Sequence, residues 1–175
     1  MNIPASLFTV RFAARQHLPL ALLSAWLILT SPWLDLRRNV PTDAGFIDYA
    51  HLFVGGITAC AAVLYAFGCL RSAGWRTYFP WLAGRFAAAR RDVVNLGQGR
   101  LPGAEGGGLF SIIEGLLLAS LLATATSGVA WLLSQGAPLA LDWRSAHLAA
   151  SRCLIGLLLA HVVAVSSHLV DLMRD

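Results

Sequence analysis

Four long stretches of the chain contain no aspartate, glutamate, lysine or arginine, and this pattern restricts the possible fold more than any other feature. They lie between Arg15 and Asp35, between Asp48 and Arg71, between Glu114 and Asp142, and between Arg152 and Asp171. Each has roughly the 17–25 residues that a helix needs to cross the hydrocarbon core of a bilayer. Because a spanning segment must satisfy its own backbone hydrogen bonds, we expect four transmembrane helices.

The composition of the 175-residue chain agrees with an integral membrane protein. Hydrophobic residues make up 57% of it and charged residues only 13%, with a mean hydropathy of +0.66, whereas a soluble domain usually has about 25% charged residues. The sequence therefore predicts an all-α fold, a membrane-spanning four-helix bundle in one domain covering residues 1–175. The three cysteines form neither a CxxC nor a CxxCH motif, so a disulfide framework, a thiolate metal cluster and a covalently attached haem are not indicated.

All 13 basic residues are arginine, and their distribution predicts how the chain is oriented. Nine fall on one side of the expected helices: Arg11, Arg15, Arg71, Arg76, Arg85, Arg90, Arg91, Arg100 and Arg174. Only Arg37, Arg38 and Arg144 fall on the other side. Since cytoplasmic loops are rich in arginine, we expect both termini in the cytoplasm. The net charge of +4 thus follows a membrane pattern and does not indicate nucleic-acid binding.

Residues 81–97, between the second and third expected helices, predict a short amphipathic helix on the cytoplasmic surface. Near one face of this helix fall Trp81, Leu82, Phe86, Ala89 and Val93, while Arg85, Arg91 and Asp92 fall largely elsewhere. The glycine-rich residues 97–108 that follow predict a flexible loop.

Four of the five histidines take matching depths in the expected helices. His17 opens the first helix on the inner side, and His51 opens the second on the outer side. We expect the fourth helix to begin before Arg152, with Asp142 as its N-cap. His147 and His161 lie 14 residues apart in this helix, which gives a rise of about 21 Å and a rotation to within about 40° of the same face. The fourth helix therefore offers one imidazole to each leaflet. The depths pair His51 with His147 outside and His17 with His161 inside.

This arrangement suits two haems b stacked across the bilayer, each held by two neutral imidazoles from facing helices. Bis-histidine ligation leaves no open iron position, so the iron would pass electrons and not bind oxygen. His168 competes with His161 as a ligand, but the rise between the two is only about 10 Å, so we interpret His168 as an interfacial residue near a haem propionate or a quinone. A single histidine near a helix end is usually a polar residue with access to water. The prediction depends on four histidines that agree in depth, leaflet and face.

Several other residues are candidates for contact with these haems. Gly55 and Gly128 would let a flat macrocycle approach the backbone, although close helix packing by small residues explains them equally well. Arg144, one turn before the outer histidine of the fourth helix, could pair with propionates of the outer haem. Arg152 lies inside the fourth helix and could extend outward to a propionate; the alternative is a polar contact with another subunit.

A histidine pattern and two short motifs resemble the bacterial di-haem cytochrome b superfamily. This group includes the membrane subunits of respiratory formate dehydrogenase and nickel-iron hydrogenase, and the small cytochrome b561 proteins. Its most specific element here is H-x13-H from His147 to His161, preceded by single histidines in the two first helices. The motifs FPWL (residues 79–82) and TSGVAW (residues 126–131) look like those of the formate dehydrogenase type. The resemblance implies His17, His51, His147 and His161 as the iron ligands, and a quinone near the inner haem.

We therefore expect an electron-transfer subunit of an oxidoreductase complex, part of a respiratory chain in the bacterial inner membrane. It would move electrons between a quinone pool near the inner leaflet and a redox partner at the outer face. The outer loops are too short for a catalytic domain, so an iron–sulfur protein, a c-type cytochrome or a molybdenum enzyme would supply that chemistry. Glu114, at the inner start of the third helix, could accept a proton from a quinol, or could be an ordinary exposed carboxylate. Two alternatives stay open: a self-contained quinone oxidoreductase of the cytochrome b561 type, and a haem-free structural subunit of a larger membrane complex.

Overall fold

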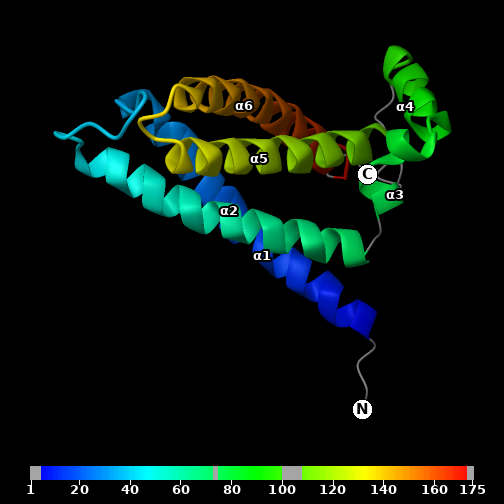
Figure 1. The fold of residues 1–175 in the computed structure, drawn as a ribbon. Helices are drawn as coiled ribbons and strands as arrows, with labels where there is room; N and C mark the ends of the chain where they lie inside the picture. The colour runs from blue at the N-terminus through cyan, green and yellow to red at the C-terminus, as the bar shows by residue number, and fades with distance from the viewer. Residues whose placement is uncertain (1–4, 73–74, 100–107, 173–175) are drawn as a thin grey trace.

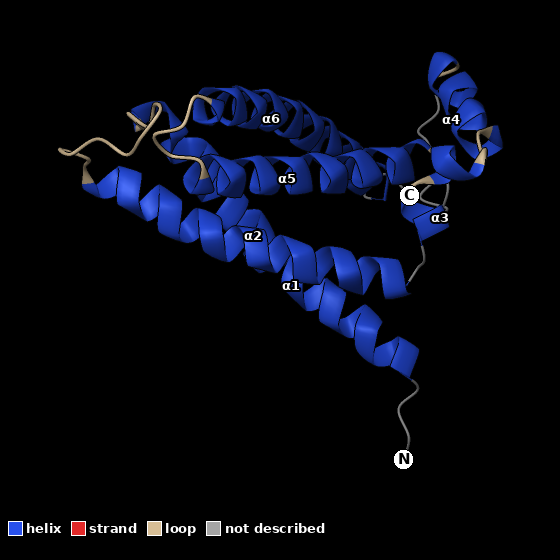
Figure 2. Cartoon of the chain, in the orientation of Figure 1, coloured by secondary structure: helices blue, strands red, loops and turns tan. Residues whose placement is uncertain are grey.

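The computed structural model describes residues 5–72, 75–99 and 108–172, and the regular secondary structure in these ranges is entirely helical (Figure 2). The long helices are α1 (Ala5–Thr30), α2 (Phe46–Ser72), α5 (Leu109–Leu133) and α6 (Leu139–Leu172). The short ones are η1 (Ser31–Trp33), α3 (Trp75–Tyr78), η2 (Pro80–Ala83) and α4 (Ala87–Gly97). The predicted all-α class is confirmed for these ranges. The predicted loop at residues 97–108 falls mostly outside the described residues, and the side chain of His168 falls outside them as well.

Three of the long helices are long and apolar enough to cross a membrane. These segments are Phe46–Arg71, Leu109–Leu133 and Leu139–Ser166, and they cover the second, third and fourth predicted spans. A helix, α1, also forms over the first predicted span, and the side chains of its residues 5–15 fall outside the described part of the chain. The structure thus indicates a membrane protein with three clear candidate spans.

The four long helices alternate in direction (Figure 1). One end of the set, which we name the terminal end, contains the start of α1, the end of α2, the start of α5 and the end of α6. The opposite end, which we name the loop end, contains residues 31–45 and 134–138. Helices α1 and α2 form one hairpin and α5 and α6 another, and the hairpins are joined through α2 and α5. Since α1 and α6 make no comparable contact within the described residues, the helices form a row and not a closed ring.

The buried apolar side chains among the described residues are few, and most of them are small. They are Leu20, Ala62, Ala66, Cys69, Ala89, Leu118, Trp131, Ala140 and Leu154. Larger apolar side chains such as Phe53, Phe67 and Leu159 point outward instead. Such a distribution is expected where lipid surrounds the helices, because small residues then let helix backbones approach closely.

Two predicted helix starts are wrong. The amphipathic helix expected over residues 81–97 is divided: η2 ends at Ala83, its C-cap Gly84 has a left-handed φ of 66°, and α4 begins only at Ala87. Glycine adopts this conformation without steric cost and ends a helix there. The last helix begins at Leu139, so Asp142 lies in its first turn and not at the expected N-cap position.

The segment from α3 to α4 is fixed to the beginning of α5 by close contacts. The buried Asp92 carboxylate accepts a hydrogen bond of 2.7 Å from the backbone N–H of Leu109, the first residue of α5. A methyl group at Gly108 would collide with that carboxylate. A methyl group at Gly115 would collide with the backbone carbonyl oxygen of Tyr78. The contact of Asp92 with the start of α5 and the contact of Tyr78 with α5 therefore require glycine at positions 108 and 115.

We expect Gly115→Ala to destabilise the protein, because its methyl group meets backbone atoms that cannot move independently of α3. Gly156→Ala is the matched control, since a methyl group there enters open space and the change favours the helix by up to about 1 kcal/mol. Thermal unfolding of the purified protein in detergent, followed by circular dichroism, should give a lower midpoint for the first variant only. A midpoint equal to that of the wild type would contradict the close contact with α3.

Candidate functional site

A cavity of about 280 Å³ lies between the two hairpins near the loop end. One water needs only about 10–15 Å³ on the same measure, so this space is much larger than a packing defect. All four long helices contribute to its wall, which consists mainly of leucine, isoleucine, alanine and glycine. The polar side chains in the wall include His51, Arg144 and His147.

His51 of α2 and His147 of α6 line this cavity and are near enough to interact electrostatically. His147 Nδ1 lies 2.9 Å from the backbone carbonyl oxygen of Thr124. A carbonyl oxygen only accepts hydrogen bonds, so Nδ1 carries the proton and Nε2 keeps its lone pair. The Nδ1 atom of His51 is buried and has no hydrogen-bond partner among the described residues. The cavity thus contains one oriented imidazole and one whose ring nitrogen the described chain does not satisfy.

The glycines predicted to contact a cofactor have different surroundings. A methyl group added at Gly55 would meet no atom within 4 Å, and Gly55 lines the cavity, so it borders open space. A methyl group at Gly128 would lie 3.1 Å from Nδ1 of His147. Gly128 therefore makes room for the imidazole that donates to Thr124, a role that sequence reasoning did not identify.

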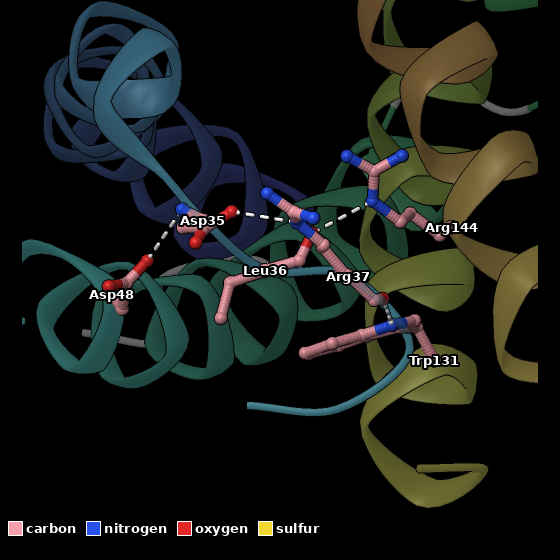
Figure 3. A network of polar contacts seen from close by, with 6 residues as sticks. All are labelled: Asp35, Leu36, Arg37, Asp48, Trp131 and Arg144. Atoms are coloured by element: carbon pink, nitrogen blue, oxygen red, sulfur yellow. Dashed lines mark hydrogen bonds and ion pairs between the residues drawn. The ribbon is translucent and has the colours of Figure 1, made fainter. Parts of the chain in front are cut away.

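The loop before α2 contributes Leu34 and Leu36 to the cavity wall. Side chains from the second hairpin hold this loop in place (Figure 3). The Arg144 guanidinium donates through Nε to the carbonyl oxygen of Leu36 at 2.8 Å. The buried Trp131 indole donates to the carbonyl oxygen of Arg37, also at 2.8 Å. The Nη nitrogens of Arg144 have no partner among the described residues, and Arg144 lines the cavity. This leaves a cationic group with free donors at the polar end of an apolar space.

Two further contacts fix the same loop at either end. Asp48, buried in the first turn of α2, accepts hydrogen bonds from the backbone N–H groups of Asp35 at 3.1 Å and Gly45 at 3.0 Å. The second bond resembles a capping box, in which an acid in the first turn binds the N–H before the helix. Arg38 donates to the carbonyl oxygen of Gly136 at 2.6 Å. The exposed ion pair between Arg37 and Asp35 contributes little by comparison.

His17 and His161 lie at a different level, toward the terminal end, and are near enough to interact electrostatically. The ring centroid of His17 is 6.2 Å from that of Tyr65, and the ring centroid of His161 is 5.4 Å from that of Phe110. The Nδ1 atom of His161 is buried without a hydrogen-bond partner in the described part of the chain. His17 itself is exposed.

A small polar cluster also lies at the terminal end. The thiol of Cys69 forms hydrogen bonds with the hydroxyl groups of Tyr65 and Tyr78, and Glu114 interacts electrostatically with both tyrosines. Burial raises the pKa of the Tyr78 hydroxyl, so this group stays protonated at physiological pH. Cys69 is therefore buried and makes polar contacts.

The predicted site residues thus separate into three groups. Those at the cavity are His51, Gly55, Gly128, Arg144 and His147; those toward the terminal end are His17 and His161; and Arg152 is exposed on α6, outside the cavity wall. No three histidine, cysteine or carboxylate side chains of the described ranges converge as in a site for a bare metal ion. The chain has no match among known protein families, curated proteins or solved structures.

We expect Trp131→Phe to loosen the loop over the cavity, because it removes the indole N–H that binds Arg37 while keeping an aromatic ring. Such a bond stabilises by about 0.5–1.5 kcal/mol. Hydrogen–deuterium exchange should become faster at residues 34–40. Trp143→Phe is the control, since Trp143 is more than a third exposed. Equal protection of the loop in both variants would show that the indole bond is dispensable.

Proposed function

We propose that the chain is a transmembrane electron-transfer protein that binds two haems b, each between two histidines. His51 and His147 would hold one haem at the loop end, and His17 and His161 the other toward the terminal end. The observation that carries this proposal is the large apolar cavity with His51 and His147 in its wall. A haem bound in this way supplies an iron that takes up and releases single electrons.

The state of the two imidazoles at the cavity supports iron ligation. The bond from His147 to Thr124 orients the ring and leaves Nε2 available, as is usual for metal-binding histidines. A buried nitrogen without a partner, such as Nδ1 of His51, costs roughly 1–3 kcal/mol, and ligation by this ring offers a compensating interaction. Two imidazoles are too few for a bare ion, and a porphyrin brings its own nitrogen ligands.

The rest of the cavity wall also fits a flat, apolar group with acidic substituents. Gly55 borders open space, so a macrocycle could approach the backbone of α2. The free Nη groups of Arg144 at the polar end would pair with a propionate, and the loop bond through Leu36 holds this arginine in place. The hairpins meet mainly through α2 and α5, so a macrocycle between them would add apolar contacts that the side chains do not provide.

Residues at the terminal end support the proposal of a second haem and of a quinone-binding site. His161 has a buried, unpartnered Nδ1 next to Phe110, and His17 interacts with it. Glu114 is half-buried beside this level and interacts with the Tyr78 hydroxyl. We infer that Glu114 would accept a proton from a quinol bound here, while Tyr78 stays a neutral donor.

The same proposal includes α1 as a fourth membrane span and a bacterial inner-membrane location. The terminal end, with most of the arginines, would face the cytoplasm together with both termini. Electrons would then cross between a quinone at that end and a redox subunit at the loop end. The loop-end segments 31–45 and 134–138 are short, which favours a separate iron–sulfur protein, c-type cytochrome or molybdenum enzyme as the partner.

We expect the purified protein to contain two haems b per chain by the pyridine haemochromogen assay. His51→Ala and His147→Ala should each remove the same haem, and His17→Ala and His161→Ala the other, because a haem that loses one axial imidazole is poorly retained. His168→Ala is the control and should keep both. No haem in the wild type would favour a structural subunit, and two haems in His147→Ala would refute the proposed pairing.

We expect Gly55→Leu to exclude the haem at the loop end although all four histidines are present, because the new side chain occupies the cavity. Gly156→Leu adds the same side chain where the structure has open space outside the cavity wall and should keep both haems. Reduced-minus-oxidised spectra with a redox titration would measure this. Two haems with unchanged midpoint potentials in Gly55→Leu would show that haem does not occupy this cavity.

A further inference from the structure

Helix α4 runs across the terminal end of the long helices and does not continue their direction (Figure 1). Its Asp92 binds the backbone N–H of Leu109, which is the first residue of the membrane-spanning segment Leu109–Leu133. The close contact between Gly115 and Tyr78 fixes the chain before α4 to the same helix. With α5 in a bilayer, α4 is therefore held at the level where the span begins, at the membrane surface.

This region carries an unbalanced positive charge. Between residues 71 and 97 the sequence has five arginines and a single carboxylate, that of Asp92. Asp92 is buried and occupied by Leu109, so it does not neutralise the surface. Arg85, Arg90 and Arg91 are exposed and form no ion pair within the described residues.

Apolar side chains are exposed on α4 beside these arginines. With 100° per residue, Arg90, Arg91 and Val94 fall on the side of the helix opposite the buried Ala89 and Asp92. Val93 and Val94 are 58% and 52% exposed, and Phe86 just before the helix is 56% exposed. Val94 thus lies between the arginines, whereas Phe86 and Val93 lie at one edge of this face, nearer the buried side. Exposed apolar side chains beside arginines are typical of helices that lie in the membrane interface.

We propose that the exposed face of α4 is a binding surface for anionic phospholipids. Arg85, Arg90 and Arg91 bind the headgroup phosphates, and Phe86, Val93 and Val94 contact the upper part of the acyl chains. Arginine is suited to this role because its planar donors bind phosphate oxygens in pairs. The arginine bias that orients a chain in the membrane requires only that the arginines lie on one side of the membrane. Lipid binding requires in addition that they lie on a surface that is fixed at the membrane interface.

The position of this face favours a phospholipid over an acidic protein as its ligand. The face is attached to the first turn of a membrane span, so lipid headgroups surround it wherever the span is inserted. Basic residues next to an anionic leaflet are attracted to its surface potential. The neighbouring Arg71 and Arg76 lie over the rings of Phe67 and Trp75 at 5.2 and 5.5 Å, and aromatic side chains of this kind are enriched at membrane–water interfaces.

The test uses the full-length protein reconstituted in phosphatidylcholine bilayers. Electron paramagnetic resonance would measure how much spin-labelled phosphatidylglycerol and spin-labelled phosphatidylcholine the protein immobilises, at low and at high salt. We expect the wild type to prefer phosphatidylglycerol several-fold at low salt and to lose much of this preference at high salt. Arg90→Gln with Arg91→Gln should bring the ratio of the two lipids close to equality.

The matched control is Arg37→Gln with Arg38→Gln, which removes the same number of charges at the loop end and should keep the preference. Arg90→Lys with Arg91→Lys keeps the charge and should keep most of the preference, so a loss in the glutamine variant is not a folding defect. A wild type without preference, or a preference that survives in the Arg90→Gln, Arg91→Gln variant, would overturn the proposal. An equal loss in the loop-end control would overturn it as well.

Discussion

The contact between α2 and α5 is the interaction on which the rest of the structure depends, because it joins the two hairpins. Apolar helices in lipid gain little from the hydrophobic effect when they associate, so they rely on close packing of small side chains. Most of the buried apolar side chains among the described residues are small, and Ala62 and Ala66 of α2 are two of them. The cavity with His51 and His147 lies between the hairpins near the loop end, and residues of all four long helices line it.

Polar groups inside the long helices are generally satisfied by their own backbone. Thr58 donates to the carbonyl oxygen of Val54 at 2.7 Å, and Ser127 donates to that of Ala123 at 2.6 Å. Against this background the buried side-chain atoms without a partner in the described ranges are informative. They belong to His51 and His161, which are two of the predicted haem ligands, and to Gln16, which directly precedes a third, His17. Unsatisfied polar atoms in an apolar environment are costly, and two of these atoms belong to histidines that we propose as haem ligands.

The sequence was sufficient to predict the long helices, because stretches without charge define membrane spans directly. It also predicted the levels of the histidines within these helices, since helical rise depends only on residue number. It could not predict that Gly84 divides the segment at residues 81–97, because a glycine is compatible with several backbone conformations. The roles of Asp48 and Trp131 were missed for another reason: each binds a backbone group of the loop, and backbone partners leave no pattern in the sequence. A signal for Trp131 existed, because a buried indole requires an acceptor.

Arginine serves different purposes at the two ends of the molecule. At the loop end, Arg144 and Arg38 donate to backbone carbonyl oxygens and Arg37 pairs with Asp35, so their charges stabilise a loop over the cavity. At the terminal end, Arg90 and Arg91 have no such partners within the described residues, although Asp92 follows directly in the sequence. The difference arises because the Asp92 carboxylate is turned inward to bind Leu109 and so is not at the surface. A single capping bond thus both fixes the direction of α4 and leaves its arginines available to groups outside the chain.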